Sequence, residues 1–179
     1  MRALVASRCS LEPQVAAHAH EMFAVLSDPA IYEFENTPPV SEAWLAERYA
    51  RLESRGPSDG TQTWLNWVIR LPDGGLAGYV QATVLPDRAA FVAYELNSRH
   101  WRQGIGSSAV QAMLRELEAQ YGVETFVAVL KAKNHRSEGL LRKLGFFPAS
   151  ERQQARYRDE ADESVLVKTT GATVPPDPA

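Results

Sequence analysis

The chain contains 179 residues, of which 45% are hydrophobic and 23% charged, and it carries a formal net charge of −3. This composition is typical of a globular protein, and the length suits one domain with a substantial core. Because basic residues are not in excess, we exclude the broad positive surface by which many proteins attract nucleic acid.

The N-terminal part of the chain is predicted to form a short strand and two helices. The strand is expected within residues 2–7. Apolar residues at helical spacing indicate a helix from Gln14 to Leu26. Ser41 is a suitable N-cap for the second helix, which includes Leu52.

Three strand-like segments follow, and the turn sequences between them predict an antiparallel meander. These segments cover residues 64–71, 76–85 and 89–96. The remaining predicted elements are a helix ending at Tyr121, a strand over 125–130, a helix over about 135–144, and strands near 147–153 and over 163–169. Nothing marks a second domain, so we expect a single domain over residues 1–170. The proline-rich tail 171–179 is expected to be disordered.

A glycine-containing loop between the third of these segments and the next helix is the most informative part of the chain. It begins after Leu96 and contains Arg102, Gly104 and Gly106. Free N–H groups at a helix N-terminus and the helix dipole favour an anion there. Glycine also lets a phosphate approach the backbone closely. We therefore expect this loop to bind a pyrophosphate.

Two kinds of cofactor fit such a loop. Gly104-x-Gly106-x-x-Ala109 matches the dinucleotide fingerprint, which would indicate an oxidoreductase that binds NAD(P). That fingerprint is normally followed by an acidic residue at the end of the next strand, whereas here the strand over 125–130 runs into Lys131-Ala132-Lys133-Asn134. The antiparallel meander also argues against a doubly wound sheet, so this interpretation ranks third.

A second motif follows the strand over 125–130. It consists of Asn134-His135-Arg136-Ser137 and, further on, Lys143-Leu144-Gly145-Phe146. Together with the glycine loop and the preceding Trp101, it resembles the GCN5-related N-acetyltransferase (GNAT) superfamily. The branch that it resembles most contains the ribosomal-protein amino-terminal acetyltransferases. The resemblance covers the chain from about Leu4 to about Lys168.

The resemblance implies an α/β (α+β) fold, in which helices flank a mixed, mostly antiparallel sheet. It implies acetyl-CoA as the co-substrate, lying where the strand ending at Leu96 splays from the strand over 125–130. The loop would hold the pyrophosphate, and Asn134 would bond the pantetheine or phosphate arm. The implied cofactor-binding residues are Leu96, Asn97, Arg102, Gln103, Gly104, Ile105, Gly106, Ser107 and Asn134.

Acetyl transfer to an amine requires a neutral nucleophile, a stabilised oxyanion and a proton for the departing thiolate. Glu95 is the first candidate for the general base, although the alternation of side chains along a strand leaves its face open. Glu33 and Glu138 are weaker candidates. By resemblance, a backbone N–H near Leu96 would polarise the thioester carbonyl. We expect direct transfer in a ternary complex, because no well-placed nucleophilic cysteine is evident.

The proton donor departs from the commoner pattern of the family. In many relatives a tyrosine lies on the helix after Asn134, and here that position is Leu141. In the branch that this chain resembles, the serine of the motif takes the role, so Ser137 is the second catalytic candidate; its alternative role is to start the helix. Because Leu141 cannot donate a proton, a coenzyme-A-binding regulator without turnover stays open as an alternative to an N-acetyltransferase.

The remaining expectations concern the acceptor and the cellular setting. The acceptor is expected to be a primary amine, on a small molecule or a protein N-terminus. We expect no metal, because the four histidines lack ligand spacing, and no membrane span. The single cysteine, Cys9, favours the reducing cytoplasm, and family resemblance suggests a homodimer. Four aromatic residues either line an acceptor pocket or pack in the core, namely Tyr32, Phe34, Trp44 and Tyr49.

Overall fold

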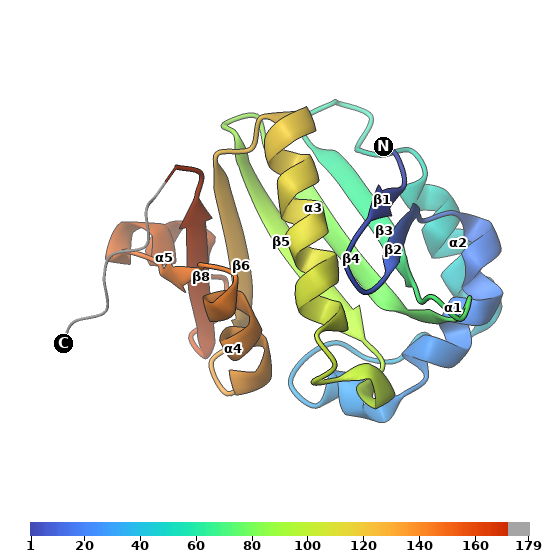
Figure 1. Ribbon diagram of the computed structural model, residues 1–179. Helices are drawn as coiled ribbons and strands as arrows, with labels where there is room; N and C mark the ends of the chain where they lie inside the picture. The colour runs from blue at the N-terminus through green and yellow to red at the C-terminus, as the bar shows by residue number, and fades with distance from the viewer. Residues whose placement is uncertain (172–179) are drawn as a thin grey trace.

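A mixed sheet of eight strands forms the centre of the molecule, in the order β1-β2-β3-β4-β5-β6-β8-β7 (Figure 1). The computed structural model describes residues 1–171. Neighbouring strands are antiparallel except for β5 and β6, so the predicted fold class is confirmed. The strands are β1 (Leu4–Val5), β2 (Ser10–Pro13), β3 (Thr63–Arg70), β4 (Leu76–Val84), β5 (Ala89–Leu96), β6 (Thr125–Lys131), β7 (Phe147–Pro148) and β8 (Glu163–Thr169).

Helices cover both faces of this sheet (Figure 1). They are α1 (Ala19–Leu26), α2 (Glu42–Leu52), α3 (Ile105–Tyr121), α4 (His135–Lys143) and α5 (Glu151–Tyr157), together with the 3₁₀ turns η1 (Ala16–His18), η2 (Pro29–Tyr32) and η3 (Ser98–His100). None of the helices described within residues 1–171 has the length and apolar character needed to cross a membrane.

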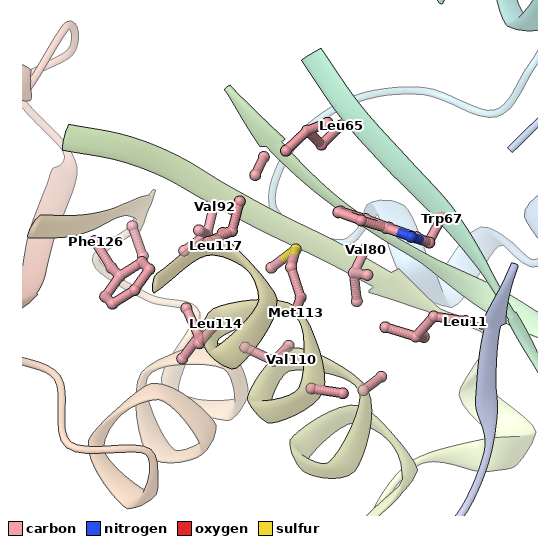
Figure 2. Close-up of a cluster of buried hydrophobic side chains, with 14 of the residues drawn as sticks. Leu11, Leu65, Trp67, Val80, Val92, Val110, Met113, Leu114, Leu117 and Phe126 are labelled. Atoms are coloured by element: carbon pink, nitrogen blue, oxygen red, sulfur yellow. The ribbon is translucent and has the colours of Figure 1, made fainter. Parts of the chain in front are cut away.

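The core is divided between the two faces of the sheet. Met113 of α3 packs on Trp67 and Val80, in the cluster that Figure 2 shows. On the opposite face, Leu45 of α2 packs in a cluster with Val68. Because successive side chains of a strand point to opposite faces, the neighbours Trp67 and Val68 serve different helices. This explains why β3 is apolar along most of its length rather than alternating.

The sheet opens between its two parallel strands. β5 and β6 pair only from Ala89, opposite Thr125, to Phe91, opposite Val127. Figure 1 shows the two strands together at one end and separated at the other, where α4 lies. The remaining part of β5, up to Leu96, therefore has no strand partner on its β6 side among residues 1–171, as the resemblance implied.

Two predicted elements differ from the structure. The helix expected from Gln14 begins later, as η1 followed by α1. The strand expected near 147–153 ends at Pro148, and α5 begins at Glu151. The reason is a capping box, in which the Ser150 hydroxyl and the Gln153 side chain satisfy each other's backbone N–H groups. The tail predicted over residues 171–179 lies, beyond Gly171, outside the residues that the structure describes.

The close approach of β4 and β5 at Gly78 predicts a large loss of stability for Gly78→Ala. A Cβ there would lie 2.0 Å from the main-chain oxygen of Glu95, which neither strand can relieve without moving. We expect a cost of about 1–3 kcal/mol or more in the free energy of unfolding, measured by urea denaturation. Gly139→Ala is the matched control, because Gly139 lies within α4 and no atom of the described chain lies within 4 Å of its Cβ position. The control should be stabilised, and equal destabilisation of both variants would contradict the argument.

Candidate active site

A cavity of about 820 Å³ occupies the opening between β5 and β6. Its walls come from the end of β5, the loop before α3, the first turns of α4 and the segment between η2 and α2. This volume is in the range of sites that bind ligands of the size of a cofactor. The cavity therefore marks the place where the sequence motifs meet in space.

Unpaired main-chain N–H groups line the loop before α3. The consecutive amides from Arg102 to Ser107 have no hydrogen-bond acceptor within residues 1–171, and no side chain caps α3. The first helical bond runs from the Ser108 N–H to the Gly104 carbonyl at 3.0 Å. Arg102 and Gly104 have left-handed backbone angles, φ 58° and 76°, and such alternation makes successive amides converge. The loop is thus built to bind an anion, which the helix dipole favours further.

Glycine is required at two positions of this loop for different structural reasons. Gly104 needs its positive φ, and a Cβ there would lie 3.0 Å from Arg8 Nε. A Cβ on Gly106 would lie 3.1 Å from Leu140 Cδ1 on α4. Gly106 therefore allows α3 and α4 to pack closely at the mouth of the opening, and it also lines the cavity.

Glu95 places its carboxylate in the cavity, on the face of the sheet that carries α1 and α2. It lies opposite Tyr79 in the β4–β5 ladder, and Asn36 Nδ2 donates to Glu95 Oε1 at 3.3 Å. Burial raises the pKa of Glu95, and the hydroxyl of Tyr79 and the amide of Asn36 offset only part of this effect. A largely buried carboxylate with a raised pKa in a cleft is a stronger base than an ordinary glutamate.

A smaller cavity of about 230 Å³ lies between α2 and the sheet. Glu95 lines both cavities, and so do Arg48 and Gln81. Glu95 is therefore at their junction. The four aromatic residues considered in the sequence analysis divide between the two cavities. The smaller cavity is lined by Tyr32, Trp44 and Tyr49, and the larger one by Phe34.

The first turn of α4 forms the opposite wall of the larger cavity. Asn134 is the N-cap, and its Oδ1 accepts a hydrogen bond from the Ser137 N–H at 3.1 Å. The Ser137 side chain lines the cavity, and its hydroxyl has no partner within residues 1–171. Tyr94 Oη donates to the main-chain oxygen of Ser137 at 3.2 Å, which ties β5 to α4. Burial raises the pKa of Tyr94 to about 12.

Residues 8–147 match the family described as Acetyltransferase (GNAT) domain. The chain belongs to the GNAT acetyltransferase family. It is therefore an acyltransferase, and acetyl-CoA is its co-substrate, as the motifs predicted. The NAD(P) interpretation is wrong. Its glycine fingerprint arises because both kinds of protein hold a pyrophosphate on a loop before a helix, whereas here the strands that precede the loop are antiparallel.

Individual GNAT proteins are similar over most of the chain. The uncharacterized N-acetyltransferase YoaA of Bacillus subtilis (strain 168) is 26% identical over 151 residues, which cover 79% of this chain and 80% of that protein. RimL, a ribosomal L7/L12 alpha-N-protein acetyltransferase solved with coenzyme A, has a TM-score of 0.76 at 19% identity, covering 92% of this chain and 96% of RimL. Mycobacterium smegmatis RimJ, solved with CoA-disulfide, has a TM-score of 0.78 at 16% identity, covering 94% and 87%.

The structure brings most of the expected cofactor residues of this GNAT protein to the larger cavity. The side of the cavity nearest α3 and α4 includes Leu96, Arg102, Gly104, Gly106, Ser107 and Asn134. Gln103 and Ile105 do not line it, although their N–H groups belong to the unpaired loop amides: the Gln103 side chain bonds the Arg99 carbonyl, and Ile105 packs in the core.

Asn97 also lies away from the cavity. Its side chain is 7% exposed, and its Nδ2 donates to the Val25 carbonyl at 2.9 Å while its Oδ1 caps η3. Its N–H donates to the Ala77 carbonyl. Both its side chain and its amide are thus used within the protein, and Asn97 positions the loop rather than facing the cavity.

The weaker candidates for the base are engaged in ion pairs at the surface. Glu33 pairs with Arg136 at 2.7 Å, and Glu138 pairs with Arg142 at 2.8 Å. The Arg136 guanidinium also lies 4.1 Å from the centre of the Trp101 ring, which links the loop to α4. Glu33 thus joins the segment after η2 to α4, whereas Glu138 is held by a neighbour within α4.

Several residues of the site were missing from the sequence-based prediction. Tyr79 could have been found, because a hairpin centred on Pro86-Asp87-Arg88 places it opposite Glu95. Asn36 and Tyr94 carry no such signal, since each meets its partner only through the tertiary fold. Leu141 is 2% exposed in the core, so this helix position does not face the cavity.

Proposed function

We propose that this protein transfers the acetyl group of acetyl-CoA directly to a primary amine, with Glu95 as general base and Ser137 as proton donor. The observation that carries the proposal is the place of Glu95, at the junction of two cavities. The larger cavity fits the co-substrate, and the smaller one leaves room for an amine. Cys9, the only cysteine, lies in the core and lines neither cavity, which favours direct transfer without an acyl-enzyme.

The loop before α3 fits the pyrophosphate of acetyl-CoA. Its unpaired amides supply donors, and the exposed side chains of Arg102 and Lys143 line the same cavity without an ion pair in the described chain. Asn134 Nδ2 keeps its donors for the pantetheine arm, because only Oδ1 is used in capping. The fit therefore rests on donors and cations that residues 1–171 leave free.

The end of β5 offers an amide for the thioester carbonyl. Asn97 donates its N–H to Ala77 on β4, and successive N–H groups of a strand point to opposite edges. The Leu96 N–H therefore points toward β6, which pairs with β5 only as far as Phe91. An amide in this place is suited to stabilise the oxyanion that forms when the amine attacks.

The acid–base chemistry matches the groups at the junction. The amine must lose a proton to attack, and Glu95 can take it because its raised pKa brings it nearer to that of an amine. An α-amine, with a pKa near 8, needs less help than a lysine amine near 10.4. The thiolate of coenzyme A takes the proton of the Ser137 hydroxyl as it leaves, and Ser137 regains a proton from the solvent, to which Glu95 releases the proton of the amine.

Ser137→Ala is expected to lower kcat by about 10²-fold, the lower range for loss of a positioned proton donor. The affinity for acetyl-CoA should stay unchanged, because the main-chain N–H of residue 137 still donates to the Asn134 side chain and its carbonyl still accepts from Tyr94. The measurement is release of free thiol under saturating amine, with acetyl-CoA affinity determined by calorimetry. Tyr94→Phe is the control, and a larger loss of kcat in that variant would assign the proton to Tyr94 instead.

The experiment that tests the proposal is a thiol-release assay with acetyl-CoA over a panel of amines and N-terminal peptides. Amine-dependent release supports the transferase. Binding of acetyl-CoA without release from any amine or peptide would overturn it in favour of the regulator. RimL and the other ribosomal-protein acetyltransferases make protein N-termini a necessary part of that panel. A cytoplasmic location and a homodimer stay predictions.

A further inference from the structure

The smaller cavity is lined by carboxamides that lack partners in the protein. Gln14 and Asn66 line it and are only 3% and 4% exposed. Their hydrogen bonds within residues 1–171 use main-chain atoms alone: the Gln14 N–H donates to the Asn66 carbonyl at 2.9 Å, and the Gln14 carbonyl accepts from Arg55 at 3.2 Å. Both residues line the cavity, so their side-chain amides are free to bond a ligand that enters it.

A row of polar side chains leads from this inner end to the junction. Asn66 on β3 lies directly opposite Gln81 on β4, and Gln81 lies opposite Ala93 on β5. Glu95 follows two positions after Ala93, on the same face of the sheet. Gln81 also makes no side-chain hydrogen bond to the described part of the chain, and it lines both cavities.

Tyr49 lines the same cavity from the side of α2. It is 3% exposed, and its hydroxyl has no hydrogen-bond partner among the described residues. Burial raises the pKa of Tyr49, so the hydroxyl stays protonated and can both donate and accept. The inner end thus offers uncharged groups of both hydrogen-bonding kinds.

The charged side chains that line the smaller cavity lie away from its inner end. Arg48 and Glu95 both line its junction with the larger cavity. Arg55 donates to the Gln14 carbonyl, but it does not line this cavity. A second ammonium group at the inner end would lose its hydration without gaining a carboxylate, and a carboxylate would find no cation among the residues that line that end. An apolar group would leave the amides unpaired.

We infer that this cavity selects acceptors that carry a carboxamide at the end distant from the reacting amine. The inference rests on the proposed function, because it places the amine at Glu95 and the carboxamide between Gln14, Asn66 and Gln81. A carboxamide donates and accepts hydrogen bonds without charge, as the inner end requires.

Four small amines of similar shape test the inference in the thiol-release assay. They are β-alaninamide, 3-methylbutylamine, β-alanine and 1,3-diaminopropane, which end in a carboxamide, an isopropyl group, a carboxylate and an ammonium. We expect kcat/KM for β-alaninamide to exceed each of the others by at least about tenfold, because a site built to hydrogen-bond a group rejects analogues that lack it. An equal or reversed order would overturn the inference.

Asn66→Leu provides a readout that loss of folding cannot imitate. It should lower kcat/KM for β-alaninamide about tenfold or more, and raise or preserve that for 3-methylbutylamine. Gln81→Leu should act in the same direction. Gln111→Leu is the matched control, because Gln111 is exposed on α3 and lines neither cavity; it should change neither value.

The outcomes separate the inference from the proposed function. If other amines are acetylated but the four test amines are not, the inference fails and the transferase stands. The same holds if Asn66→Leu lowers kcat/KM equally for β-alaninamide and 3-methylbutylamine while the affinity for acetyl-CoA is intact. If no amine or peptide is acetylated although acetyl-CoA binds, the proposed function fails and the inference fails with it.

Discussion

Glu95→Gln is expected to lower the kcat of acetyl transfer by about 10²- to 10⁴-fold, the range for loss of a general base. Glutamine keeps the size of the side chain and its contact with Asn36, so the affinity for acetyl-CoA should stay within about twofold. The measurement combines steady-state thiol release with calorimetric titration of acetyl-CoA. An unchanged kcat at all pH values would exclude Glu95 as the base.

The pH dependence gives a second test of the same residue. Burial raises the pKa of Glu95 above its ordinary value of 4.5, so activity should rise with pH across a limb that lies above that value. This rising limb of the pH–activity profile follows the fraction of Glu95 that is ionised and can accept a proton. In Glu95→Gln this limb should disappear, leaving only the deprotonation of the amine itself. Glu33→Gln, which removes a carboxylate from the ion pair with Arg136, should keep the limb.

The same substitution should stabilise the fold at alkaline pH. The folded chain keeps the Glu95 proton at pH values where the unfolded chain has lost it, because the folded pKa is raised. The contribution of this group to stability is therefore present below the ordinary pKa and is lost as pH rises through the folded pKa. At pH 8 we expect a higher Tm for Glu95→Gln, by about 2–4 °C for each kcal/mol gained. A lower Tm would contradict the assigned direction.

Gly104→Ala is expected to weaken acetyl-CoA binding by at least about tenfold. A residue with a side chain at φ 76° is strained by about 1–2 kcal/mol, and its Cβ would lie 3.0 Å from Arg8 Nε. Relief of this strain turns the neighbouring amides away from the shared anion position, and several donors are lost together. Calorimetry with acetyl-CoA measures the effect.

Gly122→Ala is the control for this prediction. Gly122 ends the same helix, α3, with a φ of 64°, and no atom of residues 1–171 lies within 4 Å of its Cβ position. Both variants should lose a similar amount of thermal stability, because both force a side chain into the left-handed region. Only Gly104→Ala should lose affinity, and an equal loss in both would show that strain in α3 acts indirectly.

The elements were predicted best where local pattern and long-range packing agree. The predicted bounds of β5 and β8 match the structure, because their apolar runs are flanked by turn residues. The strand predicted near 147–153 was wrong beyond Pro148, although the signal for a helix was present. Ser150 and Gln153 have the spacing of a capping box, and the short apolar run before them concealed it.

The candidate site shows the same division. The anion-binding loop follows from a contiguous segment, since Arg102 to Ser107 supply their own backbone donors. Ser137 and Asn134 are likewise neighbours in the chain. Glu95 was named but its face was left open, and Tyr94 and Asn36 were missed, because their roles arise only when β5 meets α4 and the segment before α2.

The sequence by itself determined the family and the position of the phosphate-binding loop, because both reside in short segments whose local conformation is encoded by glycines, caps and hydrophobic spacing. Only the tertiary structure decided which face Glu95 occupies, which of the expected cofactor residues turn inward, as Asn97 does, and that Gln14, Asn66 and Gln81 come together. The physical reason is that a side chain's burial, pKa and free hydrogen-bonding capacity depend on neighbours from distant segments, which pairing of strands and packing of helices bring into contact.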